Sequence, residues 1–219
     1  MMAAEHSGHA VSHEELRAAR VLRHGEAVQQ KLENARVAIA GLGGLGSNVA
    51  FFLTRIGVGQ LHLIDFDKVD LTNLNRQQYG IAHLGRNKTD ALAEELRAID
   101  PYIDLRCDAV RITEENAAGL LAGEPIVCEA FDAPEAKAML VNFILEHCPE
   151  KYIVAASGMA GFGDSNAIRT RRVGSRLILC GDGKTGIGEG CGLMAPRVAI
   201  AAAHEANAVV SLILGKEIC

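Results

Sequence analysis

The sequence predicts an α/β protein with a doubly wound, mainly parallel β-sheet and an antiparallel hairpin near its C-terminal end. Two observations lead to this prediction. Apolar runs of strand length alternate with segments of helical spacing over most of the chain, an order typical of parallel sheets covered by helices. In addition, Gly41, Gly43 and Gly46 directly follow the first apolar run, which is the pattern of a tight strand-to-helix turn.

Local signals place each element. A helix is expected from Ser12 toward Leu32, because Ser12 and Glu15 have the spacing of a capping box. Gly174 is expected to turn the hairpin over 168–180, and the glycine-rich segment 181–192 is expected to be a mobile loop. Strands are further expected at 36–40, 60–64, 103–110, 125–131 and 152–156, and helices from about 44, over 87–100, 113–121, 134–147 and 196–214.

Size and composition limit the possible classes of protein. The chain has 219 residues, 49% of them hydrophobic, which predicts one domain over 1–219 with a helical arm over 1–34. The formal net charge of −5 gives no reason to expect nucleic acid or an anionic membrane as a partner. The uncharged run 37–54 contains four glycines, which favours a strand and a helix over a membrane span. The N-terminus has no secretion-signal pattern, so a cytoplasmic protein is expected.

The glycine-rich turn predicts a nucleotide pocket. Gly41 makes the turn, Gly43 lets backbone N–H groups reach a phosphate, and Gly46 lets the helix that starts at about Gly44 lie close to the strand. The N-terminus of that helix favours an anion. Asp65 ends the next strand, where its carboxylate can accept hydrogen bonds from ribose hydroxyls. These residues alone leave open whether the nucleotide is NAD(H) or ATP.

Polar side chains after the second strand favour a triphosphate. Cleavage of ATP between the α- and β-phosphates develops negative charge on pyrophosphate, and fixed cations and amide donors stabilise that charge. Arg76 and Lys88 suit the β- and γ-phosphates, and Asn73 can donate to phosphate oxygens. Asp132, at the end of a later strand, suits Mg²⁺. Asp67 belongs to the same group, and the alternative is a set of surface charges with no shared task.

The combined motifs resemble one family. GLGGLGSNVA, DFDKVDLTNLNRQQY, GLMAPRV, Lys88 twelve residues after Arg76, and Asp132 at a strand end are similar to the ThiF/MoeB superfamily, relatives of the ubiquitin-activating enzymes. The resemblance covers Leu32 to the C-terminus, and AASGMAGFGDSNAI further resembles the compact bacterial ThiF subgroup. It implies a Rossmann-like fold and ATP- and Mg²⁺-dependent adenylation of the C-terminal glycine of a ubiquitin-like sulfur carrier ending in Gly-Gly. A ThiS-like carrier in thiamine biosynthesis is favoured.

The resemblance also implies roles for individual residues. Asp65 matches the ribose ligand, Asn73, Arg76 and Lys88 match phosphate ligands, and Asp132 matches a metal-linked aspartate. The family inserts an N-terminal arginine from the neighbouring subunit into the ATP site, which implies a homodimer. Arg23 is the first match for that arginine and Arg20 the second.

The cysteines depart from the pattern of larger members. None forms a C-x-x-C pair, so no zinc site is expected. Some members have a reactive cysteine eight residues before the proline of the MAP motif, but Gly188 stands at that position. Cys191, five residues before Pro196, is expected to be an inert loop thiol. Cys107 and Cys128 are expected in the core, and Cys219 near the surface.

Other functions remain open from the sequence. A MoeB-like carrier, or a small-molecule or RNA carboxylate, could be activated by the same superfamily chemistry. An NAD(H)-binding oxidoreductase is compatible with the glycine turn and Asp65, although no dehydrogenase acid–base pair stands out. A non-catalytic scaffold that holds nucleotide or carrier is the third alternative.

Overall fold

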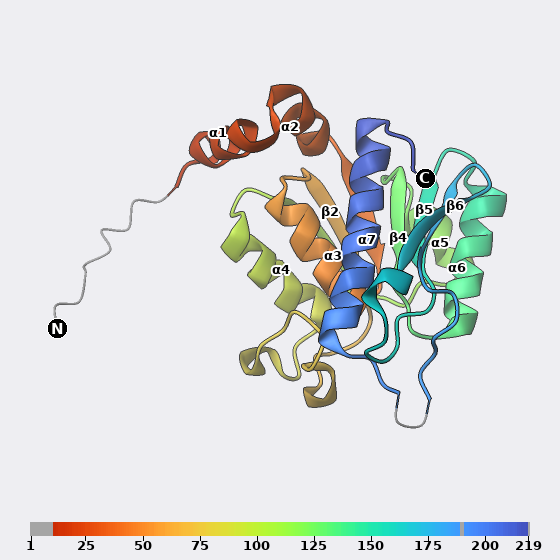
Figure 1. Cartoon of the computed structure of the whole chain (residues 1–219). Helices are drawn as coiled ribbons and strands as arrows, with labels where there is room; N and C mark the ends of the chain where they lie inside the picture. The colour runs from red at the N-terminus through yellow and green to blue at the C-terminus, as the bar shows by residue number, and fades with distance from the viewer. Residues whose placement is uncertain (1–10, 189–190, 219) are drawn as a thin grey trace.

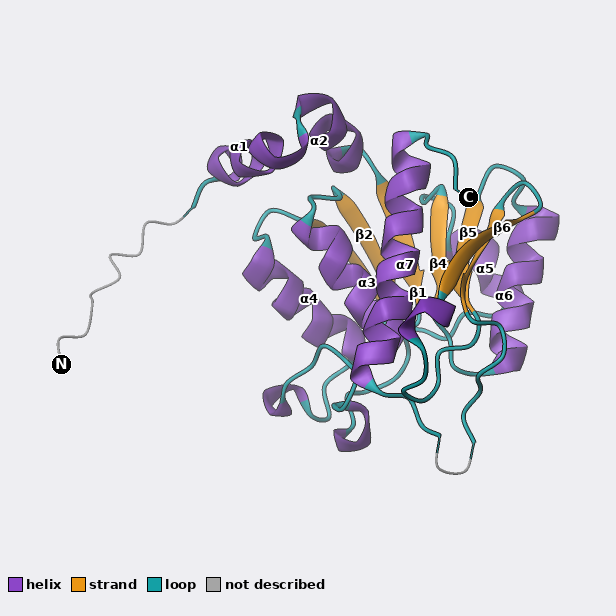
Figure 2. Cartoon of the chain, viewed as in Figure 1, coloured by secondary structure: helices purple, strands orange, loops and turns teal. Residues whose placement is uncertain are grey.

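The computed structural model describes residues 11–188 and 191–218, and its centre in these ranges is a seven-stranded sheet (Figure 2). The strand order is β3-β2-β1-β4-β5-β7-β6, in which only β6 runs antiparallel to its neighbour β7. This confirms the predicted doubly wound sheet and its C-terminal hairpin. The strands are β1 (Arg36–Ala40), β2 (Gln60–Ile64), β3 (Asp104–Asp108), β4 (Ile126–Glu129), β5 (Tyr152–Ala156), β6 (Arg169–Val173) and β7 (Leu177–Gly181).

Helices cover both faces of the sheet (Figure 1). One face carries α3, α4 and α7, and α5 and α6 lie together on the opposite face. The helices α1 and α2 form an arm that reaches the body through α2 and α7. The helices are α1 (His13–His24), α2 (Glu26–Glu33), α3 (Gly44–Arg55), α4 (Lys88–Ile99), α5 (Glu114–Leu120), α6 (Pro134–His147) and α7 (Ala195–Leu214), with 3₁₀ turns η1 (Leu71–Asn73), η2 (Ile81–His83) and η3 (Ser165–Ala167).

Strand β1 shows how the core is built on two sides. Successive side chains of a strand point to opposite faces, so Val37 and Ile39 join the core under α3 and α7, whereas Ala38 and Ala40 join the core under α5 and α6. All four are fully buried. A strand buried on both faces contains an uninterrupted apolar run, which explains why this segment stands out in the sequence.

Two details differ from the sequence prediction. The N-terminal helix is not continuous, because Gly25 takes a φ of 85° and separates α1 from α2. The expected strand 103–110 is shorter, and Cys107 within it is exposed rather than buried, because β3 lies at the edge of the sheet. Cys128 is buried as expected, and the expectation for Cys219 lies outside the described residues.

Helix α7 is long and apolar enough to cross a bilayer by length and composition. Its Val198, Ala201 and Val209 side chains are instead buried against α3 and the sheet. A core helix of this kind passes the same test, so its composition is explained by its packing.

The buried side of α7 also carries an acidic residue, Glu205. Its side chain is fully buried, and neither carboxylate oxygen has a hydrogen-bond partner among the described residues. Burial raises the pKa of Glu205 well above its usual value, the negative charge of Glu129 raises it further, and Lys137 opposes the shift. The folded protein therefore binds this proton more tightly than the unfolded chain does.

We expect Glu205→Gln to remove this pH dependence. Because the pKa is raised in the folded state, the contribution of Glu205 to stability is fully present below its unfolded pKa of about 4.5 and is lost as the pH rises toward the folded value. The free energy of unfolding of the variant should exceed that of the wild type by a margin that grows at up to about 1.4 kcal/mol per pH unit. Urea denaturation between about pH 4 and about pH 8 measures this margin. Exposed Glu217→Gln is the control, and a margin independent of pH would contradict the assignment.

Candidate nucleotide site

A cavity of about 960 Å³ lies at the carboxyl ends of β1, β2, β4 and β5. Ligands of doubly wound sheets bind at this edge, and the volume is suited to a nucleotide. Residues far apart in the sequence meet there because parallel strands all end at the same side. The predicted residues that line the cavity are Gly41, Gly43, Gly44, Asp65, Asp67, Asn73, Arg76, Lys88 and Asp132.

In the glycine turn between β1 and α3, Gly41 and Gly46 have no room for a side chain, whereas Gly43 has open space around it. Gly41 has a φ of 94°, and a Cβ added there would lie 2.8 Å from the carbonyl oxygen of Ala130. A Cβ on Gly46 would lie 1.9 Å from the carbonyl oxygen of Gly41, so α3 can approach the turn only with glycine at this position. A Cβ on Gly43 would meet only the Gln77 amide nitrogen, at 3.9 Å. Gly43 therefore presents open backbone to the cavity.

The N-terminus of α3 faces the same cavity. Its N-cap is Gly43, and no side chain caps the first-turn N–H groups. Gly43, Gly44 and Leu45 all line the cavity. Unpaired N–H groups and the positive end of the helix dipole make this position suitable for an anion such as a phosphate.

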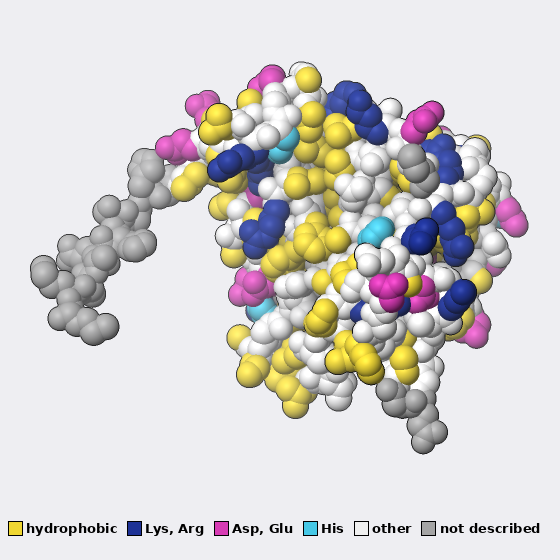
Figure 3. All heavy atoms as spheres, in the orientation of Figure 1, with side chains coloured by type: hydrophobic (Ala, Val, Ile, Leu, Met, Phe, Trp, Pro, Cys, Tyr) yellow, Lys and Arg dark blue, Asp and Glu magenta, His cyan; other side chains and the backbone are white. Residues whose placement is uncertain are grey.

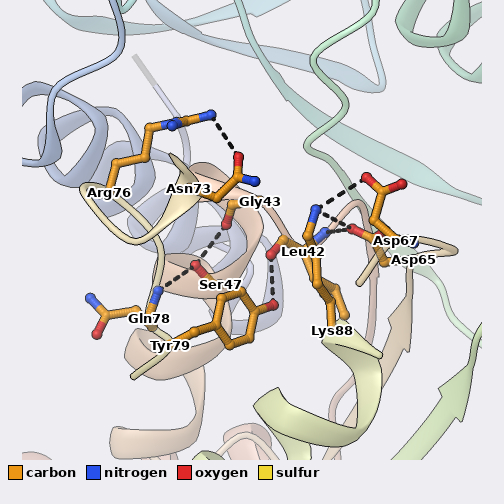
Figure 4. A network of polar contacts seen from close by, with 10 residues as sticks. All are labelled: Leu42, Gly43, Ser47, Asp65, Asp67, Asn73, Arg76, Gln78, Tyr79 and Lys88. Atoms are coloured by element: carbon orange, nitrogen blue, oxygen red, sulfur yellow. Dashed lines mark hydrogen bonds and ion pairs between the residues drawn. The ribbon is translucent and has the colours of Figure 1, made fainter. Parts of the chain in front are cut away.

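Asp65 ties the turn to the end of β2 (Figure 4). Its carboxylate accepts from the N–H of Leu42 at 2.7 Å and from the N–H of Asp67 at 2.8 Å. The Lys88 Nζ lies 3.7 Å from the same carboxylate. Burial raises the pKa of Asp65, and the charge of Lys88 and the two backbone hydrogen bonds oppose that shift.

Two cations stand on either side of the turn (Figure 4). Lys88, the first residue of α4, donates to Asp67 at 3.2 Å, and half of the Asp67 side chain is exposed. Arg76 donates to the side-chain oxygens of Asn73 at 3.2 Å and of Asn75 at 2.9 Å. Its guanidinium has no carboxylate partner among the described residues, so its charge is available to an anion in the cavity.

Asp132 and Arg23 occupy different environments. Asp132 follows β4, is exposed into the cavity, and has no hydrogen bond or ion pair in the described part of the chain. A free carboxylate beside a phosphate site fits Mg²⁺, which binds through one or two carboxylates and keeps waters. Within residues 11–188 and 191–218 no group of three His, Cys, Asp or Glu side chains is placed to hold a metal ion. Arg23 lies on exposed α1 and does not line the cavity.

The remaining arginines of the arm are engaged within the chain. Arg20 pairs with Asp100 at 2.8 Å and donates to the carbonyl of Thr54, and Arg17 pairs with Glu26 and Glu33. Arg23 has no partner among the described residues. Cys191 is half-buried and does not line the cavity. Its backbone forms an isolated antiparallel β-bridge with that of Gly188.

Some cavity residues were not singled out from the sequence. Gln77 lines the cavity, and its buried Oε1 has no hydrogen-bond partner among the described residues. The Phe66 ring lies under the Arg111 guanidinium, 3.7 Å from the ring centroid. The position of Gln77 directly after Arg76 is the sequence signal that could have identified it. The pairing of Phe66 with Arg111 depends on the contact between β2 and β3 and has no such signal. Thr185 and Ile187 come from the loop after β7, whose sequence carries no comparable signal.

A glycine turn, a strand-end acid and two cations around one cavity are the features of a nucleotide-binding α/β protein. The family model described as "ThiF family" matches residues 16–218, so the chain belongs to the ThiF family. This confirms the resemblance found in the sequence.

Two curated relatives show how far the similarity in sequence extends. The chain is 37% identical over 130 residues to the probable adenylyltransferase/sulfurtransferase MoeZ of Mycobacterium tuberculosis, a match that covers 56% of this chain and 33% of that protein. It is 37% identical over 105 residues to the molybdopterin-synthase adenylyltransferase of Salmonella typhimurium, covering 48% of this chain and 42% of that protein. The matched segments therefore span less than half of these curated relatives.

The E. coli tRNA N6-threonylcarbamoyladenosine dehydratase TcdA, solved in complex with ATP, superposes with a TM-score of 0.83. The superposition covers 94% of this chain and 97% of that one at 21% sequence identity. At this identity the likeness shows the fold alone.

Proposed function

We propose that this chain is an ATP-dependent adenylyltransferase that activates a carboxylate. The observation that carries the proposal is the meeting of open glycine amides with Asn73, Arg76 and Lys88 around one cavity. A dehydrogenase would leave this group of phosphate-binding side chains without a task. The names of two relatives, both adenylyltransferases, support the same reaction.

The reaction follows from the charges of these residues. A carboxylate oxygen of the substrate attacks the α-phosphorus of ATP, and the bond from that phosphorus to the oxygen bridging to the β-phosphate breaks. The products are an acyl-adenylate and pyrophosphate. Arg76 and Lys88 would stabilise the charge that develops on the leaving pyrophosphate, while Asn73 and the Gly43 amide donate to phosphate oxygens. Asp65 would hold the ribose hydroxyls, and Asp67 would orient Lys88.

A magnesium ion is part of the proposal. Asp132 would hold it together with phosphate oxygens, and the bound ion would supply further neutralisation of the triphosphate. The carboxylate of Asp132 is suited to this role because no cation of the described chain occupies it.

For the substrate we propose the C-terminal glycine of a ubiquitin-like sulfur carrier that ends in Gly-Gly. A ThiS-like carrier of thiamine biosynthesis in the cytoplasm is favoured by the motifs of the compact ThiF subgroup. An adenylyltransferase named for molybdopterin synthase has a protein substrate, which supports this class of partner. We expect no zinc in this enzyme. We propose that residues 1–219 act as one adenylyltransferase domain, with residues 1–34 as its helical arm.

A second candidate is activation of an RNA-borne carboxylate. It is supported by 34% identity over 122 residues to the tRNA threonylcarbamoyladenosine dehydratase of E. coli, a match that covers 55% of this chain and 46% of that protein. The net charge of −5 disfavours it, because binding of a phosphate backbone depends on clustered positive charge.

We further propose that the protein acts as a homodimer in which Arg23 enters the partner's ATP site. Arg17 and Arg20 are engaged in their own subunit, which leaves Arg23 as the free arginine of the arm within the described residues. Phe51 and Phe52 of α3 and Ile200 of α7 are apolar and only partly buried. Hydrophobic side chains gather on the side of the molecule that carries α3 and α7, a surface suited to a second copy (Figure 3).

Pyrophosphate exchange into ATP tests the proposed reaction. The wild type should exchange label only when a Gly-Gly-ended carrier is present. Arg76→Ala and Asp132→Ala should lower the exchange rate by about 10²- to 10³-fold, because each removes charge stabilisation of the transition state. Arg172→Ala, which removes an exposed arginine on β6 outside the cavity, is the control and should leave the rate unchanged.

Full exchange by either variant would contradict the assigned roles. Exchange that depends on a tRNA instead of a carrier would favour the second candidate. Absence of both exchange and AMP release with every partner would favour a non-catalytic scaffold.

Mixing two inactive variants tests the role of Arg23. In a mixed dimer of Arg23→Ala and Arg76→Ala subunits, one site has an intact Arg76 and receives an intact Arg23 from its partner. Since half of the dimers are mixed, exchange should recover to about a quarter of the wild-type rate. Recovery should be absent if Arg23 acts in its own subunit. If Arg23 has no role, Arg23→Ala alone should exchange at the wild-type rate, so each variant alone is the control.

A further inference from the structure

The backbone of Leu42, the residue between Gly41 and Gly43, is held on two sides (Figure 4). The N–H of Leu42 donates to Asp65, and the carbonyl oxygen of Leu42 accepts a hydrogen bond from the Tyr79 hydroxyl at 2.7 Å. Tyr79 belongs to the loop between β2 and α4, in a segment that follows Arg76. One residue of the glycine turn is therefore fixed from the end of β2 and from this loop.

The bond from Tyr79 also determines where the next amide points. The Leu42 carbonyl and the Gly43 N–H belong to one trans peptide group, so they point in opposite directions. The Gly43 N–H consequently points away from Tyr79. It has no hydrogen-bond partner among the described residues, and Gly43 lines the cavity with open space around it.

Because residue 43 is glycine, the orientation of the Leu42–Gly43 peptide group depends on the hydrogen bond from Tyr79. Without a Cβ, the residue tolerates rotation of the preceding peptide group, so the backbone alone does not fix the direction of its N–H. Tyr79 is only 7% exposed, and its ring lies edge-on to His83, whose Nδ1 accepts from the Gly80 N–H. Burial raises the pKa of Tyr79 well above 10, so the hydroxyl stays protonated and donates.

We propose that Tyr79 is a positioning residue for nucleotide binding: its hydroxyl fixes the Leu42–Gly43 peptide so that the Gly43 N–H is aimed at a phosphate group. The inference rests on the proposed ATP site and extends it to a residue that does not line the cavity. It has a distinctive consequence. Loss of the hydroxyl should weaken binding of the phosphates and leave binding of the nucleoside unchanged.

Equilibrium binding to Tyr79→Phe tests the proposal. Calorimetry should give an ATP affinity about five- to tenfold weaker than that of the wild type, the effect of one hydrogen bond. Adenosine affinity should stay within about twofold, because its binding involves no phosphate. Tyr102→Phe is the matched control, since it removes another tyrosine hydroxyl that donates to a backbone carbonyl, that of Val11 at 2.9 Å, outside the cavity.

An equal loss of ATP and adenosine binding, or an equal loss in Tyr102→Phe, would overturn the proposal by indicating a general structural effect. If Tyr79→Phe does not fold, the Gly43 amide resonance of the wild type decides instead. It should shift on addition of inorganic pyrophosphate and not of adenosine, and no shift would overturn the proposal. A wild type that binds ATP but adenylates nothing would contradict the proposed function and leave this inference standing.

Discussion

The carboxylate of Asp65 links three parts of the site that are separate in the sequence. It accepts hydrogen bonds from the glycine turn at Leu42 and from the following loop at Asp67, and it lies beside Lys88 at the start of α4. Burial disfavours its negative charge, and the donors around it offset that cost. Removing these donors would leave a buried charge unpaired, so the turn, the loop and the cation depend on one another.

This arrangement explains why the cavity has the properties of an anion site. The turn supplies N–H groups and the positive end of α3, and the loop supplies Arg76 and Asn73. Each group comes from a segment that follows a parallel strand, so the sheet delivers them to one edge. The negative net charge of the protein plays no part, because these donors and cations act over short distances within the cavity.

The sequence predicted the structure correctly at positions where the fold permits few residue types. Gly41 and Gly46 are required by a positive φ and by a close approach, and both effects are visible in the order of residues. The run 36–40 identified a strand buried on both faces. The break at Gly25 was missed because a glycine within a helical pattern is often tolerated. The contribution of Tyr79 could not be predicted, since it depends on a contact between residues 37 positions apart.

The sequence does not show which side chains pair with one another in the folded protein. Arg17, Arg20 and Arg23 look alike in the sequence, and only the structure separates two engaged arginines from a free one. Lys88 pairs with Asp67 and lies near Asp65, a contact that follows from the way the loop after β2 folds back to α4.

A crystal structure of the wild type with ATP and magnesium tests the central claim most directly. It should place the triphosphate between the N–H of Gly43 and the side chains of Arg76 and Lys88, with the ribose at Asp65. A nucleotide that binds with Arg76 and Lys88 turned away, or a cavity that stays empty with ATP and is filled by NADH, would contradict the account.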